Sequence, residues 1–353
     1  MRVAVLMGGR SSERDVSLAS GRSVCNGLAE AGHESIPIEI AQDGRWELGG
    51  LARVKSGAAA PVAAVRDRPD AVAHSDVPVD ATGAPARIAG YELREQVDVV
   101  FPVLHGPFGE DGTVQGLLDI LDVPYVGSGV AASAIAMDKS LFKDVMKANG
   151  IPTTESVTFR DGDEIENPFG FPVVVKPARL GSSVGISIAA DGNEFEAAVA
   201  LAFAHDDKIL VERHVAGREV ECSVLGNDDP IASVTGEIVV LGEGWYDYEA
   251  KYSEGGVRLI APAEVATDVA ERVRELSLRA FHACDCAGMA RVDCFVDEDD
   301  GVLINELNTI PGFTKTSVYP KLFEASSVDY PTLLSRLVEL ALERHERRNR
   351  LQH

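Results

Sequence analysis

The chain has 353 residues, 45% of them hydrophobic and 25% charged, which is enough for two or three domains with cores of their own. Its 56 acidic and 33 basic side chains give a formal net charge of −23, which disfavours nucleic acid as a partner. No apolar run approaches the ~20 residues of a membrane span, so a membrane is not an expected partner either. Five scattered cysteines without zinc spacing predict reduced thiols in a cytoplasmic protein.

The first part of the chain predicts an open α/β domain over residues 1–128. The pattern Ser12-x-x-Asp15 predicts a capping box that opens a helix ending near Gly32. Residues 51–90 are rich in Ala and Pro without a clear period, so a loop-rich insertion is expected there. The other predicted elements are strands over 2–7, 97–104 and 124–126 and a helix over 113–121.

The rest of the chain predicts two further units, over 129–217 and 218–353, of which the first is a small α+β unit. An Asn193-x-x-Glu196 capping signal predicts a helix over 194–205. The other helices and strands expected here are helices over 130–137, 139–148, 264–284 and 331–346 and strands over 171–176, 184–189, 208–212, 220–225 and 231–240.

An antiparallel hairpin is expected near the C-terminal end. Residues 289–296 and 302–308 alternate apolar and polar side chains, and an acidic turn joins them. Pairing Val302 with Asp297 sets the register, since the two numbers of every facing pair then have the same sum.

In that register, the hairpin brings four polar side chains to one face. Glu306 faces Asp293, and Asn308 faces Arg291. Two carboxylates and a carboxamide beside a cation suit Mg²⁺ ions that carry nucleotide phosphates. The alternative is a solvated hairpin face, but facing carboxylates repel without a cation, which favours the metal interpretation.

A lysine at a strand end precedes a loop of small residues. Lys176 is followed by Gly181-Ser182-Ser183, where backbone N–H groups can approach anionic oxygens. The loop lacks the Walker and Rossmann patterns, and a hairpin loop without a ligand remains the alternative. Lys139 at the start of a helix opposes the helix dipole, which hints at a ligand. Without the small-residue loop and the hairpin, a solvated surface lysine would be the favoured interpretation.

Four more side chains and one loop are weaker candidates. Glu212 ends a strand where it could accept hydrogen bonds from an adenine amine or a ribose, and Glu219 follows it. Glu13 and His105 follow strand ends in the first domain, where open α/β sheets bind ligands. The polar, aromatic loop at 243–256 is suited to a lid, with a surface hairpin as the alternative.

Nine motifs in order resemble those of the ATP-grasp superfamily, and specifically those of D-alanine–D-alanine ligases. The resemblance covers nearly the whole chain, and it implies a three-domain ATP-grasp fold of α/β and α+β units with an N-terminal open α/β sheet. The substrate-binding domain would span 1–128, the central ATP-grasp domain 129–217 and the C-terminal one, with hairpin and lid, 218–353. The motifs are at 8–17, 105–112, 127–129, 137–139, 176–177, 181–185, 248–252, 291–293 and 305–312.

The resemblance also implies ligands, an assembly and roles for individual residues. The implied ligands are ATP, two Mg²⁺ ions, for which Mn²⁺ can substitute, and two D-alanine molecules. The implied assembly is a homodimer. The implied ATP-binding residues are Lys139, Lys176, Ser182, Ser183, Glu212, Val215, Glu219 and Lys251, and the implied metal ligands are Asp293, Glu306 and Asn308. The implied catalytic residues are Glu13, Ser182, Tyr252, Arg291 and Gly312, and the implied substrate-binding residues are Glu13, His105 and Ser317.

The implied reaction is ATP-dependent ligation of two D-alanines through a D-alanyl phosphate, for peptidoglycan precursor synthesis. Residues 314–318 differ from the family patterns, so D-lactate or D-serine as the second substrate remains an alternative. Tyr252 in the lid favours the dipeptide, because it adds no positive charge near an incoming ammonium. A catalytically silent nucleotide-binding module is the other alternative, although such a chain is expected to lose some of the residues named above.

Overall fold

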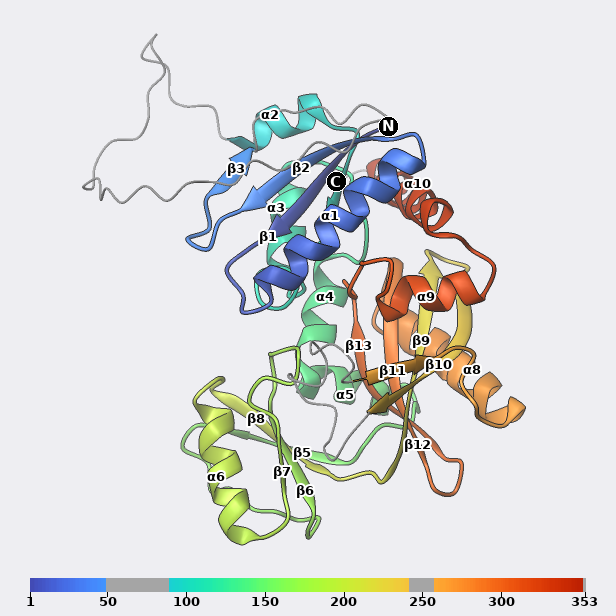
Figure 1. The fold of residues 1–353 in the computed structure, drawn as a ribbon. Helices are drawn as coiled ribbons and strands as arrows, with labels where there is room; N and C mark the ends of the chain where they lie inside the picture. Colours follow the sequence, from blue (N-terminus) through green and yellow to red (C-terminus); the bar gives the residue numbers. More distant parts are fainter. Residues whose placement is uncertain (49–88, 241–256, 352–353) are drawn as a thin grey trace, which may run out of the picture.

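The computed structural model describes residues 1–48, 89–240 and 257–351. Within these ranges the chain forms three β-sheets with helices packed on them (Figure 1). The expected insertion lies outside the described residues up to position 88, and the expected lid lies entirely outside them. Across the described ranges, no helix has the length and apolar character needed to span a membrane.

The N-terminal sheet has the strand order β3-β2-β1-β4. β1 pairs in parallel with both β2 and β4, and β3 is an antiparallel edge strand. Residues 3–7 of β1 are all buried, as expected of a strand covered on both faces. The segment predicted as a strand at 124–126 makes only an isolated bridge, from Tyr125 to Val100. The bounds are β1 Arg2–Gly8, α1 Arg14–Glu30, β2 Glu34–Ile40, β3 Trp46–Leu48, α2 Ala89–Gln96, β4 Val99–Pro102 and α3 Thr113–Ile120.

The central part of the chain forms an antiparallel sheet in the order β5-β8-β6-β7. Two helices, α4 and α5, lead into it, and both have the predicted bounds. The bounds are α4 Val130–Met137, α5 Lys139–Ala148, β5 Ser156–Arg160, β6 Val173–Pro177, β7 Ser187–Ala189, α6 Gly192–Phe203 and β8 Lys208–Arg213.

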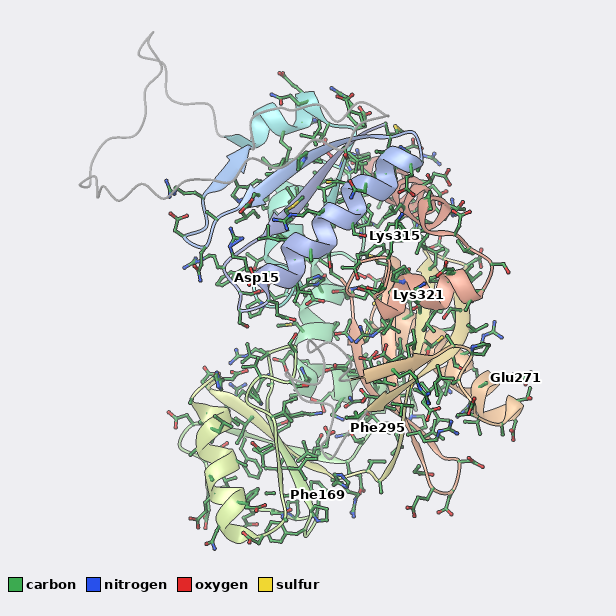
Figure 2. The ribbon with its side chains drawn as sticks, in the orientation of Figure 1. Asp15, Phe169, Glu271, Phe295, Lys315 and Lys321 are labelled. Carbon is green, nitrogen blue, oxygen red and sulfur yellow. The ribbon has the colours of Figure 1, made fainter. Side chains whose placement is uncertain are left out.

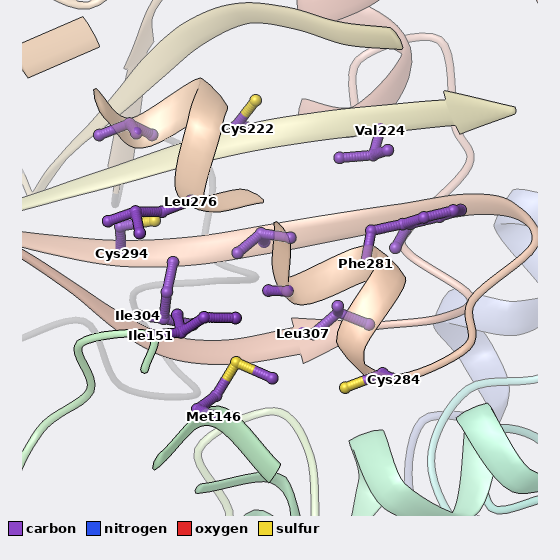
Figure 3. Close-up of a cluster of buried hydrophobic side chains, with 14 of the residues drawn as sticks. Met146, Ile151, Cys222, Val224, Leu276, Phe281, Cys284, Cys294, Ile304 and Leu307 are labelled. Atoms are coloured by element: carbon purple, nitrogen blue, oxygen red, sulfur yellow. The ribbon is translucent and has the colours of Figure 1, made fainter. Parts of the chain in front are cut away.

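The C-terminal part forms a five-stranded antiparallel sheet in the order β11-β10-β9-β12-β13. Helix α8 packs on one face of it, and Figure 3 shows how Leu276 and Phe281 of this helix meet the strands. Met146 of α5 joins the same buried cluster. The bounds are β9 Gly217–Gly226, β10 Ile231–Val240, β11 Val257–Ile260, α8 Thr267–Ala283, β12 Gly288–Asp297, β13 Val302–Asn308, α9 Val318–Ala325 and α10 Tyr330–Asn349.

Both predicted helix caps are wrong. Helix α1 has Glu13 at its N-cap position and no side-chain cap bond, because the Ser11 hydroxyl holds the turn by accepting from the Glu13 N–H and donating to the His105 carbonyl. Helix α6 is capped by Asp191, whose carboxylate accepts from the two N–H groups at 193 and 194. An aspartate directly before the helix satisfies these donors better than the predicted Asn193, which lies inside the helix.

The hairpin of β12 and β13 exists, and a β-bulge corrects its predicted register. Asp293 pairs with Glu306 and Arg291 with Asn308, as predicted. The predicted pairing of Val302 with Asp297 is wrong, because Val302 pairs with Val296. One extra residue on β13, at position 305, accounts for the difference between the two ends of the hairpin.

Helix α10 returns to the N-terminal sheet and packs against α1 (Figure 1). The close approach depends on Gly27 in α1. A Cβ atom there would lie 2.5 Å from Leu334 Cδ1 and 2.5 Å from Tyr330 Cε1. The Tyr330 hydroxyl is held by the Phe313 carbonyl at 2.6 Å, so its ring cannot simply move away.

Replacing Gly27 with alanine should therefore destabilise the protein by about 1–3 kcal/mol, although alanine favours helix formation. Gly192→Ala is the matched control, because Gly192 is also helical and a Cβ atom added to it would meet no described atom within 4 Å. That control should be neutral or stabilising by up to about 1 kcal/mol. Urea unfolding of the three proteins measures both effects, and equal stability of the two variants would contradict this explanation of the packing.

Candidate active site

The central sheet and the hairpin approach each other through charged side chains. Lys176, on β6, donates to Glu212 Oε1 at 3.0 Å and to Asn305 Oδ1 at 3.4 Å. Lys139, at the start of α5, lies 3.5 Å from Glu306 Oε2 and donates to the Leu180 carbonyl at 2.6 Å. Side chains from two sheets and one helix are thus tied together at a single junction.

A cavity of about 190 Å³ lies at this junction. Apolar side chains that the sequence analysis missed form part of its wall, among them Ile186, Ile188 and Phe295. Figure 2 labels Phe295, which belongs to β12. The predicted site residues that line the cavity are Lys139, Lys176, Ser182, Ser183, Glu212, Val215, Glu219 and Glu306.

The bulge explains why Asn305 and Glu306 both line the cavity. Successive side chains of an unbroken strand point to opposite faces, so only one of the two could do so without the extra residue. Asn305 was missed because the register predicted from the sequence was regular.

Glu212 is a buried carboxylate between two lysines. Burial opposes its ionisation, but the charges of Lys143 and Lys176 outweigh that effect and lower its pKa to about 2. Lys143 was missed, although it follows Lys139 by one helical turn on α5. Burial lowers the pKa of Lys143 to about 8, against the opposing charge of Glu212.

The facing carboxylates of the hairpin contact different cations. Asp293 accepts two hydrogen bonds of 2.7 Å from Arg291 and one of 3.0 Å from Asn308 Nδ2, whereas Glu306 approaches Lys139. Buried Glu221, also missed, faces Asp293 from β9 and lies 3.0 Å from Arg291 Nε. Within the described ranges, no three acidic, histidine or cysteine side chains already form a metal-binding group.

The donor chemistry of this face nevertheless fits a hard cation. Asp293, Glu306 and Asn308 bring carboxylate and carboxamide oxygens to neighbouring positions on two paired strands. The carboxylates at 221, 293 and 306 lie in one row across three strands, and like charges in such a row need cations between them.

Glu13 and Ser182 meet although they are far apart in sequence. The Ser182 hydroxyl donates to Glu13 Oε1, which connects the loop after β6 to the start of α1. The backbone of Ser182 and Ser183 is left-handed, with φ angles of 50° and 58°. Such strained positions are typical of functional loops.

The other predicted substrate residues lie in, or in contact with, the segment between β13 and α9. His105 is buried, its Nδ1 lies 3.0 Å from the Ile310 carbonyl, and burial lowers its pKa. Gly312 lies next to Ser317, since a Cβ atom on this glycine would lie 3.1 Å from Ser317 Oγ. The predicted residues Lys251 and Tyr252 lie outside the described residues.

Comparisons with known proteins agree with this arrangement. Residues 2–128 match the family model for the D-Ala D-Ala ligase N-terminus, and residues 145–339 match that for the C-terminus. A D-alanine–D-alanine ligase of Geobacillus thermodenitrificans is 44% identical over 356 residues, which cover 98% of this chain and 96% of that protein. The chain belongs to the D-alanine–D-alanine ligase family.

Solved structures of D-alanine ligases have the same ATP-grasp fold. The D-alanine–D-alanine ligase of Coxiella burnetii superposes with a TM-score of 0.80 at 34% identity, covering 99% of this chain and 96% of that one. The VanG D-Ala:D-Ser ligase of Enterococcus faecalis gives a TM-score of 0.78 at 31% identity, with 96% and 99% covered. The predicted ATP-grasp fold is confirmed.

Glu110 is a further, partly buried residue of this ligase that the sequence analysis did not single out. It accepts from the Gly106 N–H at 2.7 Å and from the Ile310 N–H at 3.2 Å, which connects the N-terminal sheet to the segment after β13. Burial, with help from the charge of Glu13, raises its pKa to about 8.

Glu110 should make stability fall as pH rises from 4.5 towards 8, because the folded protein keeps a proton there that the unfolded chain has lost. Glu110→Gln removes this titration. The free energy of unfolding of the variant, relative to that of wild type, should therefore rise by on the order of 3 kcal/mol from about pH 5 to pH 9. Urea unfolding at both pH values measures the difference, with the exposed Glu324→Gln as control; a difference independent of pH would contradict the assignment.

Proposed function

We propose that the protein joins two D-alanine molecules into D-alanyl-D-alanine, with ATP converted to ADP and phosphate, for peptidoglycan precursor synthesis. The observation that carries this proposal is the junction of Lys139 and Lys176 with the oxygen donors of the hairpin. Cations that can hold phosphates lie there directly beside oxygens that can hold Mg²⁺. Membership of the ligase family supports the choice of substrates.

ATP would lie in the cavity at this junction. Glu212 Oε2 is buried beside Lys143 Nζ, and a carboxylate oxygen has two acceptor positions, so it can also accept from the adenine amino group. The Val215 backbone and Glu219 would contact the rest of the adenosine. The residues proposed to hold the phosphates are Lys139, Lys176, Ser182, Ser183 and Lys251.

Asp293, Glu306 and Asn308 would hold two Mg²⁺ ions, for which Mn²⁺ can substitute. When bound, the ions would offset the negative charge of the transferring phosphoryl group. Arg291 already neutralises Asp293, at 2.7 Å. It would also stabilise the oxyanion, together with the Gly312 N–H.

The first D-alanine would bind through its ammonium to Glu13, assisted by His105. Its carboxylate attacks the γ-phosphorus, which releases ADP and forms D-alanyl phosphate, a substrate with a good leaving group. The second D-alanine, held by its carboxylate near Ser317, passes an ammonium proton to a base, a phosphate oxygen or water. Its neutral amine then attacks the acyl carbon, and the C–O bond to phosphate breaks, which releases phosphate. Tyr252 in the lid would help to exclude water, which would otherwise hydrolyse the acyl phosphate.

The remaining assignments follow from the family. We place domain boundaries near 128 and near 217, and we propose a homodimer in the cytoplasm. The likeness to the D-Ala:D-Ser ligase leaves D-serine as an alternative second substrate.

A competition assay tests the choice of substrates. With D-alanine, D-lactate and D-serine together at neutral pH, we expect D-alanyl-D-alanine as the main product and one ADP for each dipeptide. A main product containing lactate or serine would overturn the specificity, and ATP binding without any ADP release would favour a silent nucleotide-binding module.

Asp293→Asn and Glu306→Gln should each lower ADP formation by at least about a hundredfold, because loss of a carboxylate ligand removes several kcal/mol of charge stabilisation. Circular dichroism should show an unchanged fold. Glu298→Gln is the matched control, because it removes an exposed carboxylate from the turn of the same hairpin. Variants that keep wild-type rates at limiting Mg²⁺ would show that these carboxylates do not bind metal.

A further inference from the structure

Lys143 is a buried cation with no role in the proposed reaction. It lies on α5, one turn after Lys139, and only 1% of its side chain is exposed. A lysine ammonium has three N–H donors. Lys143 Nζ donates to the hydroxyl of Thr154, to the carbonyl of Thr154 at 3.3 Å and to Thr153 Oγ1 at 3.2 Å.

The charge of Lys143 acts on Glu212. Lys143 Nζ lies 2.9 Å from Glu212 Oε2, while Lys176 takes the other oxygen, Oε1. Other donors of Lys143 are directed to the two threonines, so this lysine takes at most one of the two lone pairs of Oε2. The lysine therefore attracts the carboxylate and leaves an acceptor position on Oε2 open.

We propose that Lys143 is a positioning residue that holds Glu212 ionised, with Oε2 directed at the amino group of the adenine ring. The inference rests on the proposed function only in taking the cavity as the ATP site. Lys176 alone would pull the carboxylate towards the phosphates. A second cation on the opposite oxygen fixes the carboxylate between the two ammonium groups.

Lys143 also connects Glu212 to the hairpin of β12 and β13. The Thr153 hydroxyl donates to the Ile304 carbonyl at 2.7 Å, and the Ile304 N–H donates to the Pro152 carbonyl at 2.9 Å. Ile304 directly precedes Asn305, which accepts from Lys176. Lys143 thus fixes the position of the Glu212 carboxylate relative to β13, the strand that carries Asn305.

Recognition of the base tests the proposal. Calorimetry with Mg²⁺ compares ADP with inosine diphosphate, in which a carbonyl replaces the amino group and faces Glu212 with a second acceptor. Lys143→Met should lower the preference for ADP by about 10- to 100-fold, as expected for the loss of a hydrogen bond to a charged group. Lys147→Met, at an exposed lysine one turn further along α5, should keep the wild-type preference.

Glu212→Gln provides the second half of a double-mutant cycle. If Lys143 acts through Glu212, adding Lys143→Met to Glu212→Gln should leave the preference within about twofold of that of Glu212→Gln alone. The double variant lacks both charges, so neither of them is left buried without its partner, and the comparison also serves if Lys143→Met by itself does not fold. An unchanged preference in folded Lys143→Met, or a further loss in the double variant, would overturn the proposal.

Binding of these diphosphates is measured without D-alanine. A wild-type protein that binds ADP but releases none from ATP and D-alanine would therefore overturn the proposed function and leave this inference standing. If the protein has full ligase activity but Lys143→Met keeps the wild-type preference for ADP, the inference fails and the proposed function stands.

Discussion

Two buried lysines, Lys139 and Lys176, require oxygen partners that their own helix and strand do not supply, and the arrangement of the site depends on these contacts. Lys176 finds Glu212 on the neighbouring strand and Asn305 on a different sheet, while Lys139 finds Glu306. A buried ammonium without such partners is costly, so these contacts hold the central sheet against the hairpin. The same contacts leave a cavity where cations and carboxylate oxygens lie side by side, as a nucleotide with its metal ions requires.

Most of this site was predictable because its chemistry lies in short motifs. The alternation of residues 289–308 predicted a hairpin with Asp293 opposite Glu306, and the structure has that pairing. The bulge at Asn305 was not predictable, since a regular period gives no signal for one extra residue. Its consequence is large, because it turns two successive side chains towards the cavity.

The missed residues are those whose importance comes from burial. Nothing in the sequence separates Lys143 from Lys147, yet one is buried against Glu212 and the other is exposed. Glu221 and Glu110 likewise look like ordinary glutamates until strands and loops distant in sequence enclose them. Short elements such as β5 and β11 were missed for a related reason, since tertiary pairing stabilises them more than their own periodicity does.

Phosphorylation of a carboxylate at the junction of the lysines with the hairpin is the central step of the proposed reaction. Oxygen transfer tests it most directly. With D-alanine labelled with ¹⁸O in its carboxyl group, phosphate released during dipeptide formation should carry one labelled oxygen, because that oxygen leaves with the phosphoryl group. Mass spectrometry of the phosphate measures the label. Unlabelled phosphate formed together with dipeptide would contradict an acyl phosphate intermediate.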